Sequence, residues 1–234
     1  TTEVEAINAQ LEAANARLRV LGRAKDAFVS NVSHELRTPI SNQMLCIQLL
    51  RRRPDKQDFY MDALKRETLR LEQMIEGLLT LSRLDQGQLT LDVTELDLNE
   101  LAREFVSDRT SLAAERGIEL SLRACDNLLP AAGDPVLIGQ VLSILLTNAL
   151  NYTPDGGKVL VSTLREPSLG ESWVGLRVQD TGPGIAAEDR PYLFSRFFRG
   201  LAGRASSTPG TGLGLAIAKE IVDQHNGRIQ LDDD

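Results

Sequence analysis

Two glycine-rich segments contain the residues whose types and spacing most directly suggest a chemistry. Residues 180–185 read Asp-Thr-Gly-Pro-Gly-Ile after a predicted strand, and residues 210–215 read Gly-Thr-Gly-Leu-Gly-Leu at the start of a predicted helix. Glycines let backbone N–H groups approach phosphate oxygens, and a helix start adds unpaired donors and the positive end of the helix dipole. Both segments therefore indicate anion binding, although either one alone is also compatible with an ordinary turn. Neither fits the Rossmann or P-loop pattern.

Two asparagines lie in an otherwise apolar predicted helix. Asn148 and Asn151 are three residues apart, on nearly one helix face. An amide carbonyl can complete the coordination shell of a magnesium ion that phosphates and waters otherwise hold. The alternative is a helix C-terminal cap, which suits Asn151 better than Asn148 because the helix must stop before Thr153-Pro154.

His34 is the side chain that could accept a phosphoryl group. It lies on a predicted helix within Ser33-His34-Glu35-Leu36-Arg37-Thr38-Pro39, so we expect its ring to be exposed. Attack on a γ-phosphorus needs a neutral imidazole, and a carboxylate that takes or orients the other ring proton makes the free nitrogen more basic. Glu35 at i+1 must reach around the helix, whereas Thr38 at i+4 lies over the same face as His34. Pro39 predicts a bend.

The second histidine and the two cysteines are predicted to have no chemical role. His225 ends a predicted helix before Asn226-Gly227, where a left-handed cap and a cation near the helix carbonyls both fit. Cys46 and Cys125 lie far apart and outside any CxxC spacing, which is typical of reduced thiols in a cytoplasmic protein.

The N-terminal part of the chain predicts helices that dimerise. Apolar residues at alternating spacings of three and four predict a parallel coiled coil over residues 1–27, since so narrow a strip could not cover a globular face. The helix that contains His34 should continue to about Arg53, and a second helix should run from about Asp58 to Leu84. Two such hairpins, over residues 28–86 of each chain, would form an antiparallel four-helix bundle. The heptad positions are Val4, Ile7, Leu11, Ala14, Leu18 and Leu21.

Residues 87–234 are predicted to form a mixed α/β sandwich domain, so the fold class is multidomain, α and then α+β. We read the uncharged run from Pro135 to Pro154 as a buried helix, because amide and hydroxyl side chains interrupt it. The expected strands are Ile118 to Leu122, Lys158 to Leu164, Trp173 to Gln179 and Arg228 to Leu231. The expected helices are Leu98 to Glu115, Pro135 to Asn151, Ala187 to Phe194 and Leu213 to His225.

Composition narrows the class of protein further. The 234 residues are 42% hydrophobic and 25% charged, which is typical of soluble globular domains and not of disordered or fibrous chains. The formal net charge of -7 gives no overall basic surface with which to hold a phosphate backbone, so nucleic acid is not an expected partner.

The order and spacing of the motifs resemble the transmitter region of sensor histidine kinases, from Phe28 to Leu231. In that family a HisKA dimerisation and phosphoacceptor domain precedes a Bergerat-type HATPase domain. The resemblance rests on five motifs: an H box at Ser33 to Pro39, an N box around Asn148, a first glycine box at residues 180–185, an F box at Phe194 to Arg199 and a second glycine box at residues 210–215.

The resemblance implies a homodimer that binds ATP and Mg²⁺, phosphorylates its own His34 and passes the phosphoryl group to an aspartate of a response regulator receiver domain. It implies Glu35 as the base and Thr38 as a helper in dephosphorylating the response regulator. It also implies a cytoplasmic location and attachment to a membrane only through an upstream sensor region that is not visible in the sequence.

For the nucleotide, the resemblance implies that Asp180 accepts a hydrogen bond from the adenine amino group, Asn148 holds Mg²⁺ and Arg199 meets the terminal phosphate. Residues Gly200 to Pro209 would form a lid. The other implied nucleotide-binding residues are Asn151, Tyr152, Gly182, Gly184, Ile185, Gly210, Thr211, Gly212, Leu213, Gly214 and Leu215.

Three features depart from the family pattern. Ile144 replaces an asparagine, Asn151 replaces a frequent lysine, and the chain ends at Asp232-Asp233-Asp234 without the usual last strand. Two alternatives therefore stay open: a signalling scaffold or phosphatase in which nucleotide only orders the lid, and an ATPase of the gyrase type without phosphohistidine. The coiled coil and the His34-Glu35 turn have no use in the second.

Overall fold

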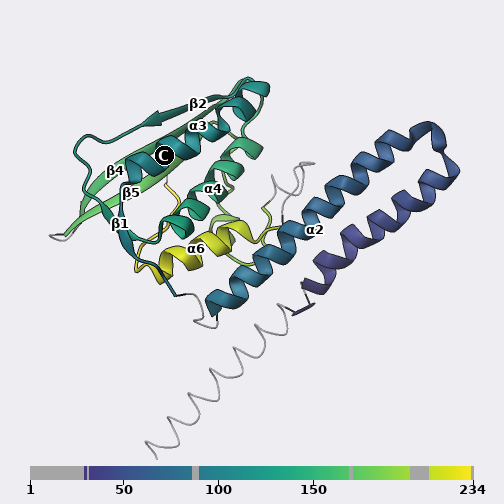
Figure 1. Cartoon of the computed structure of the whole chain (residues 1–234), viewed down its shortest axis with the longest axis horizontal. Helices are drawn as coiled ribbons and strands as arrows, with labels where there is room; N and C mark the ends of the chain where they lie inside the picture. Colours follow the sequence, from purple (N-terminus) through teal and green to yellow (C-terminus); the bar gives the residue numbers. More distant parts are fainter. Residues whose placement is uncertain (1–28, 31, 86–89, 169–170, 201–210, 233–234) are drawn as a thin grey trace, which may run out of the picture. The chain divides into compact units, whose positions relative to one another are not determined.

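The structure is a computed structural model of the 234-residue chain (Figure 1). It describes residues 29–30, 32–85, 90–168, 171–200 and 211–232. The chain divides into two compact units, Thr1–Met74 and Ile75–Asp234. The predicted coiled coil over residues 1–27 lies outside the described residues.

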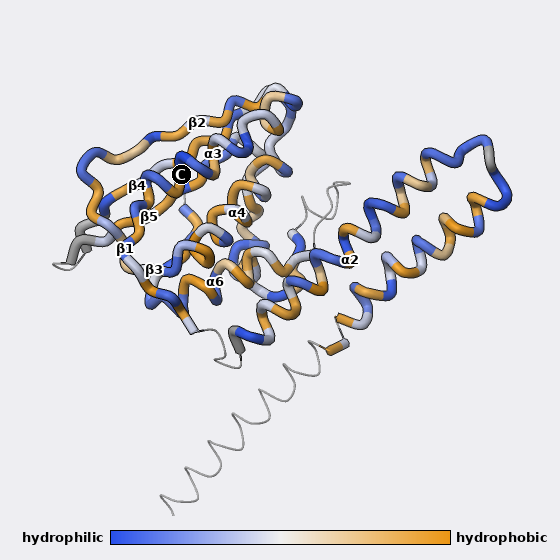
Figure 2. Tube along the Cα trace, in the orientation of Figure 1, coloured by the Kyte–Doolittle hydropathy of each residue, from blue (hydrophilic) through white to orange (hydrophobic). Residues whose placement is uncertain are grey.

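The first unit contains a helical hairpin, as the sequence predicted. Its first helix covers residues 32–52, and the short 3₁₀-helix η1 (Pro54–Lys56) leads into the long helix α2 (Gln57–Asp85) (Figure 1). The first helix ends where Pro54 lacks the N–H that would continue it. In Figure 2 apolar segments recur along both helices, which is the pattern of helices that pack through one face.

Many large apolar side chains of the hairpin are exposed in the single chain. Met44 is 59% exposed, and comparable exposure recurs on both helices. Exposed apolar surface of this extent is typical of a surface that packs against another molecule. The residues of the first unit concerned are Val29, Ile40, Met44, Leu45, Ile47, Phe59, Met61 and Leu69.

The α/β domain of the second unit contains two small sheets and three helices within its described residues. Parallel β2 (Glu119–Arg123) and β4 (Lys158–Ser168) form one sheet with antiparallel β5 (Glu171–Asp180), in the order β2-β4-β5. Strands β1 (Thr94–Leu96) and β3 (Ala131–Gly133) pair antiparallel. The helices are α3 (Leu98–Glu115), α4 (Pro135–Tyr152) and α6 (Gly214–Gln224), and a 3₁₀-helix, η2, covers Arg190–Tyr192 (Figure 1).

The core of this domain lies between α3, α4 and the three-stranded sheet. Leu142 and Leu146 on α4 are fully buried one turn apart, and Val159 and Val161 on β4 are fully buried two residues apart. These spacings place each pair on a single face of its element. Full burial of such a side chain stabilises the fold by roughly 1.5–3 kcal/mol. By length and composition alone α4 is apolar enough to cross a membrane, but its leucines belong to this core.

Aspartates begin two of the helices. The Asp97 carboxylate accepts hydrogen bonds from the N–H groups of Asn99 and Glu100 at the start of α3. Asp134 does the same for Val136 and Leu137 at the start of α4, where Pro135 takes the first helical position. These caps satisfy donors that a helix start leaves free, which explains why both helices begin where the sequence predicted.

Two predicted elements were wrong and two strands were missed. The helix expected at Ala187 to Phe194 is only the 3₁₀ turn Arg190–Tyr192, because Pro191 has no N–H and crowds the preceding turn. Residues 228–231, expected to form a strand, lie in the described part of the chain but form no strand, and Leu231 is exposed, so pairing there would bury little apolar surface. Strands β1 and β3 have only three residues each, too few for a recognisable alternation.

Candidate functional sites

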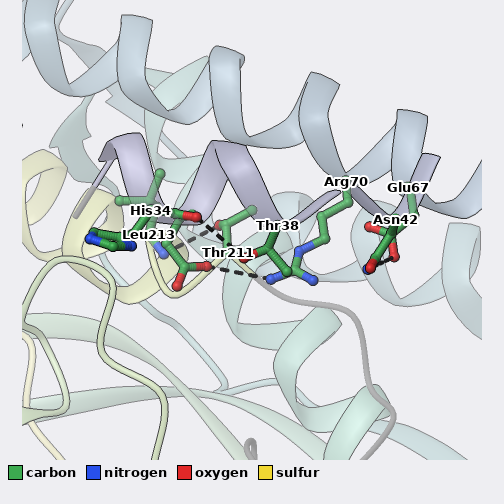
Figure 3. Close-up of polar contacts among 8 residues, drawn as sticks. His34, Thr38, Asn42, Glu67, Arg70, Thr211 and Leu213 are labelled. Carbon is green, nitrogen blue, oxygen red and sulfur yellow. Dashed lines mark hydrogen bonds and ion pairs between the residues drawn. The ribbon is translucent and has the colours of Figure 1, made fainter. Parts of the chain in front are cut away.

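His34 lies on the exposed side of the first helix of the hairpin, as predicted. The Thr38 hydroxyl donates a hydrogen bond to the backbone carbonyl of His34, with 3.3 Å between the two oxygens (Figure 3). This contact confirms that Thr38 lies one turn along the same face. The helix assignment continues through Pro39.

Glu35 is half-buried and points across the hairpin to α2. Its Oε2 accepts a hydrogen bond from Arg70 Nη2 at 3.4 Å, and the two groups form an ion pair. About two turns further along the first helix, Asn42 Nδ2 donates to Glu67 Oε1 at 2.9 Å (Figure 3). Sequence reasoning missed Arg70, because residues 35 apart are brought together only by antiparallel pairing of the helices and no local pattern indicates it.

The predicted nucleotide-binding residues of the N box lie on one face of α4. Ile144, Asn148 and Tyr152 follow each other at intervals of four residues, with Asn151 beside Tyr152, and all are half-buried. Side chains at this spacing stack on one side of a helix. The alternative of Asn151 as the C-terminal cap was wrong. Thr153 is the cap, and both its N–H and its hydroxyl donate to the carbonyl of Ala149.

Arg116, which sequence reasoning also missed, holds the end of α4. Its guanidinium donates to the carbonyls of Leu150 and Thr153, at 2.5 and 2.9 Å, and to the carboxylate of Asp155 at 2.9 Å. A cation at a helix C-terminus satisfies free carbonyls and opposes the negative end of the helix dipole. Arg116 therefore fixes the helix end that contains Asn151 and Tyr152.

The first glycine segment meets the C-terminal end of this face. Asp180, the last residue of β5, is exposed, and its Oδ1 accepts a hydrogen bond from the Gly182 N–H at 2.7 Å. A Cβ atom on Gly182 would lie 2.6 Å from Asp180 Oδ1 and 3.0 Å from the Tyr152 carbonyl oxygen, so a larger residue would displace the Asp180 carboxylate and crowd the end of α4. Gly184 adopts a positive φ of 70° in the same segment, and Ile185 is half-buried.

The second glycine segment meets the middle of the face and the F box. A Cβ atom on Gly214 would lie 3.1 Å from Ile144 Cγ2. Gly212 has a φ of 68°, and a Cβ atom there would lie 2.7 Å from the backbone carbon of Phe197, so the F box passes directly beside it. Arg199, at the end of the F box, is half-buried. Leu213 is fully buried, and its N–H donates to the Thr211 hydroxyl at 3.3 Å (Figure 3).

The structure thus brings together most of the residues predicted to bind nucleotide. The Gly182 segment and the Gly214 segment contact α4 at Tyr152 and Ile144 respectively, with Asn148 between them on the helix. Helix α6 begins at Gly214, and its N-cap Leu213 supplies no side-chain hydrogen bond to the first turn. Gly210 and all of the predicted lid except Gly200 lie outside the described residues.

The N-terminal end of α4 is fixed by Asp134 and His225. Burial alone would raise the pKa of the Asp134 carboxyl, but hydrogen bonds from the N–H groups of Asp92, Leu137 and Val136 outweigh it and lower this pKa below its ordinary value of 3.8. His225 Nε2 accepts a hydrogen bond from the Asp134 N–H at 3.0 Å.

This contact corrects the interpretation of His225 as a cation. Because Nε2 accepts a hydrogen bond it carries no proton, so the geometry assigns the neutral tautomer in which Nδ1 donates to the Ile221 carbonyl at 2.7 Å. Asn226 provides the predicted left-handed position, with a φ of 54°. The structural role of His225 is therefore to tie the end of α6 to the start of α4.

Comparisons with known proteins find both parts of this arrangement. The model of the "His Kinase A (phospho-acceptor) domain" family matches residues 24–87, and that of the "Histidine kinase-, DNA gyrase B-, and HSP90-like ATPase" family matches residues 133–234. The fold and the sites define a class of proteins that join a phosphoacceptor hairpin to an ATPase domain.

Similar proteins agree on the family. Sensor protein SphS of Synechococcus elongatus is 37% identical over 217 residues, which cover 89% of this chain and 51% of that protein. Sensor-like histidine kinase SenX3 of Mycobacterium tuberculosis is 35% identical over 211 residues, covering 89% of this chain and 50% of that protein. The chain belongs to the sensor histidine kinase family, and it spans about half the length of these relatives.

Solved structures have the same organisation. Histidine kinase AdeS of Acinetobacter baumannii is 28% identical with a TM-score of 0.62, over 81% of this chain and 86% of that one. Histidine kinase ThkA in complex with response regulator protein TrrA is 26% identical with a TM-score of 0.68, over 91% of this chain and 57% of that one.

Proposed function

We propose that this chain binds ATP in the α/β domain, transfers the γ-phosphoryl group to His34 and passes it on to an aspartate of a response regulator receiver domain. The observation that supports this most is that α4 presents one face, through Asn148, to two glycine segments that converge on it from different parts of the sequence. The solved complex of the similar kinase ThkA with a response regulator supports the choice of partner.

In the ATP site, each group would have a separate task. Asp180 keeps one carboxylate oxygen in the hydrogen bond to Gly182 and has the other available for the adenine amino group. The free N–H groups at the start of α6 and the glycine backbones would receive the phosphates. Arg199 would add a positive charge at the terminal phosphate.

Mg²⁺ fits this site through a single amide ligand. No group of three or more His, Cys, Asp or Glu gathers into a metal site among the described residues. The ion would therefore depend on the phosphates and waters, and the half-buried Asn148 amide would complete its shell. When bound, Mg²⁺ neutralises charge that develops on the phosphates.

At His34, one ring nitrogen attacks the γ-phosphorus and the bond to the bridging oxygen of ADP breaks. The other ring nitrogen loses its proton, and Glu35 is the base that takes it. Transfer to the response regulator breaks the new N–P bond and forms an O–P bond on an aspartate. The Thr38 hydroxyl, on the same face as His34, would orient water for phosphatase activity.

The active form would be a homodimer. The chain would be the cytoplasmic part of a sensor protein. The HisKA match and the exposed apolar side chains of the hairpin support an antiparallel four-helix bundle made by two chains. A scaffold or phosphatase with weak kinase activity is the second candidate. The absence of an amide at Ile144 and of a lysine at Asn151 favours it.

Incubation with γ-labelled ATP and Mg²⁺ tests the proposal. We expect label on the protein that is lost in acid and retained in base, which identifies phosphohistidine. Consumption of ATP without protein-bound label would indicate an ATPase without phosphohistidine. Bound nucleotide with neither label nor ATP consumption would indicate the scaffold.

A further inference from the structure

Arg70 is a residue of α2 to which the proposed chemistry gives no role. Polar side chains join the first helix of the hairpin to α2 at three positions in its described part: Glu35 with Arg70, Asn42 with Glu67, and Gln43 with Thr68. The first of these contacts differs from the others, because Glu35 is the proposed base.

The contact decides where the Glu35 carboxylate lies. A residue at i+1 leaves a helix about 100° away from its neighbour, so Glu35 has no inherent orientation toward His34. A free glutamate would sample many rotamers. In the structure the Arg70 guanidinium holds its Oε2 at 3.4 Å, with the two side chains 19% and 37% exposed. A partly exposed single ion pair of this length adds little to stability, and its main effect is to restrict orientation.

A second observation concerns the surroundings of the Arg70 guanidinium. Arg70 Nε and Glu67 Oε2 are both buried, and neither has a hydrogen-bond partner in the described part of the chain. Because the two residues are three apart on α2, their side chains lie on the same side of the helix. They are opposite in charge. The other Glu67 oxygen is fixed by Asn42 (Figure 3). Glu67 therefore adds a negative charge on the same side of α2 as Arg70, although the only ion pair of Arg70 within the described residues is the one with Glu35.

We propose that Arg70 is a positioning residue for autophosphorylation. Its guanidinium orients the Glu35 carboxylate so that it can accept the proton from His34. The inference rests on the proposed function, in which Glu35 is the base. It predicts that Arg70 affects the chemical step and leaves the binding of ATP, which occurs in the other unit of the chain, unchanged.

Initial rates of His34 labelling over a range of ATP concentrations test this in Arg70→Gln. We expect kcat to fall at least tenfold, because a misplaced base loses much of the roughly 10²–10⁴-fold that proton transfer contributes. The KM for ATP and the melting temperature should not change. Arg70→Lys should recover part of the rate, because it keeps a cation but not the planar fork of donors.

Gln43→Ala is the matched control. It removes the contact between Gln43 Nε2 and Thr68 Oγ1, which spans the same two helices at 2.9 Å and involves no residue of the proposed chemistry. We expect its kcat to stay within about twofold of the parent chain. An equal loss in Gln43→Ala and Arg70→Gln would show a general weakening of the hairpin and overturn the proposal.

The double variant Glu35→Gln/Arg70→Gln gives the second criterion. If Arg70 acts through Glu35, the double variant should be no slower than Glu35→Gln alone. Multiplicative losses, or a faster rate in Arg70→Gln, would overturn the positioning role. A parent chain that forms no phosphohistidine would instead refute the proposed function. A labelled parent with an unaffected Arg70→Gln would refute the role of Arg70 alone.

Discussion

The helical hairpin and the α/β domain bury their apolar side chains in different ways. The α/β domain closes its own core, in which Leu142, Leu146 and Val159 are fully buried. The hairpin leaves Met44 and Phe59 more than half exposed in the single chain. The proposed nucleotide site therefore depends on contacts within one chain, whereas the proposed phosphoacceptor His34 belongs to a unit whose apolar surface is suited to a second copy.

The two sites also place their functional groups by different means. In the α/β domain, close backbone approaches at Gly182 and Gly212 set the geometry, so the sequence reveals it through glycine spacing. In the hairpin, a contact between Glu35 and Arg70 on separate helices sets it, and the sequence does not reveal the pair. The comparison predicts that substitutions in the hairpin change assembly or chemistry, and substitutions in the domain change affinity or stability.

The largest expected effect is on assembly. Met44→Lys combined with Ile47→Lys should raise the dissociation constant of the dimer at least about 10²-fold, because two apolar side chains worth roughly 1.5–3 kcal/mol each are lost from the proposed interface. Light scattering over a range of protein concentrations measures this dissociation constant. Val136→Lys, at a 79% exposed position on α4, is the control and should leave the mass unchanged. Equal masses for all three proteins would contradict the difference between the two regions.

Asp180→Asn should weaken ATP binding by roughly ten- to a hundredfold. An amide can turn its donor toward the adenine amino group, and a hydrogen bond to a charged group is worth about 1.5–3 kcal/mol. Calorimetric titration with ATP measures the affinity, and light scattering should show an unchanged dimer. Unaltered affinity would remove Asp180 from the nucleotide site.

Ile144→Asn should raise the rate of autophosphorylation about tenfold, if one hydrogen bond of about 1.4 kcal/mol is recovered in the transition state. Ile144 is only half-buried, so an amide there can keep contact with water and need not lower stability. The initial rate and the melting temperature of the same variant show whether position 144 affects the chemical step or the stability of the domain. A slower and less stable variant would show instead that Ile144 stabilises the domain by packing beside Gly214.

Asp134→Ala should lower the free energy of unfolding of the α/β domain by about 1 kcal/mol at pH 7, through loss of the α4 cap. The folded state lowers the pKa of Asp134, so this carboxyl stabilises the fold above its unfolded pKa, and the effect is lost as pH falls below 3.8.

Asp134→Asn is the matched control for the acid limb, because asparagine is also a good cap and does not titrate. Denaturant unfolding from pH 7 to pH 3 should show the gap between wild type and Asp134→Ala closing with acid, and Asp134→Asn should lack that titration. If the difference in free energy of unfolding between wild type and Asp134→Ala does not change with pH, the stabilisation does not depend on the charge of the Asp134 carboxyl.

The α/β helices could be predicted because their start signals are local. Asp97 and the Asp134-Pro135 pair lie directly at the beginnings of α3 and α4, and α3 ends where it was expected, at Glu115. The N box face and both glycine segments followed from spacing and close backbone approach. The contacts of Arg70, Arg116 and His225 span 34 or more residues, and no local pattern predicts which partner each side chain meets.

The central claim is that the two regions divide the reaction, with ATP bound in the α/β domain and phosphate accepted on the hairpin. His34→Gln tests it most directly when protein-bound label from γ-labelled ATP and the affinity for ATP are measured on the same preparation. We predict complete loss of label with unchanged affinity, because the imidazole is the acceptor and takes no part in binding nucleotide. Stoichiometric label that persists in His34→Gln would contradict the account.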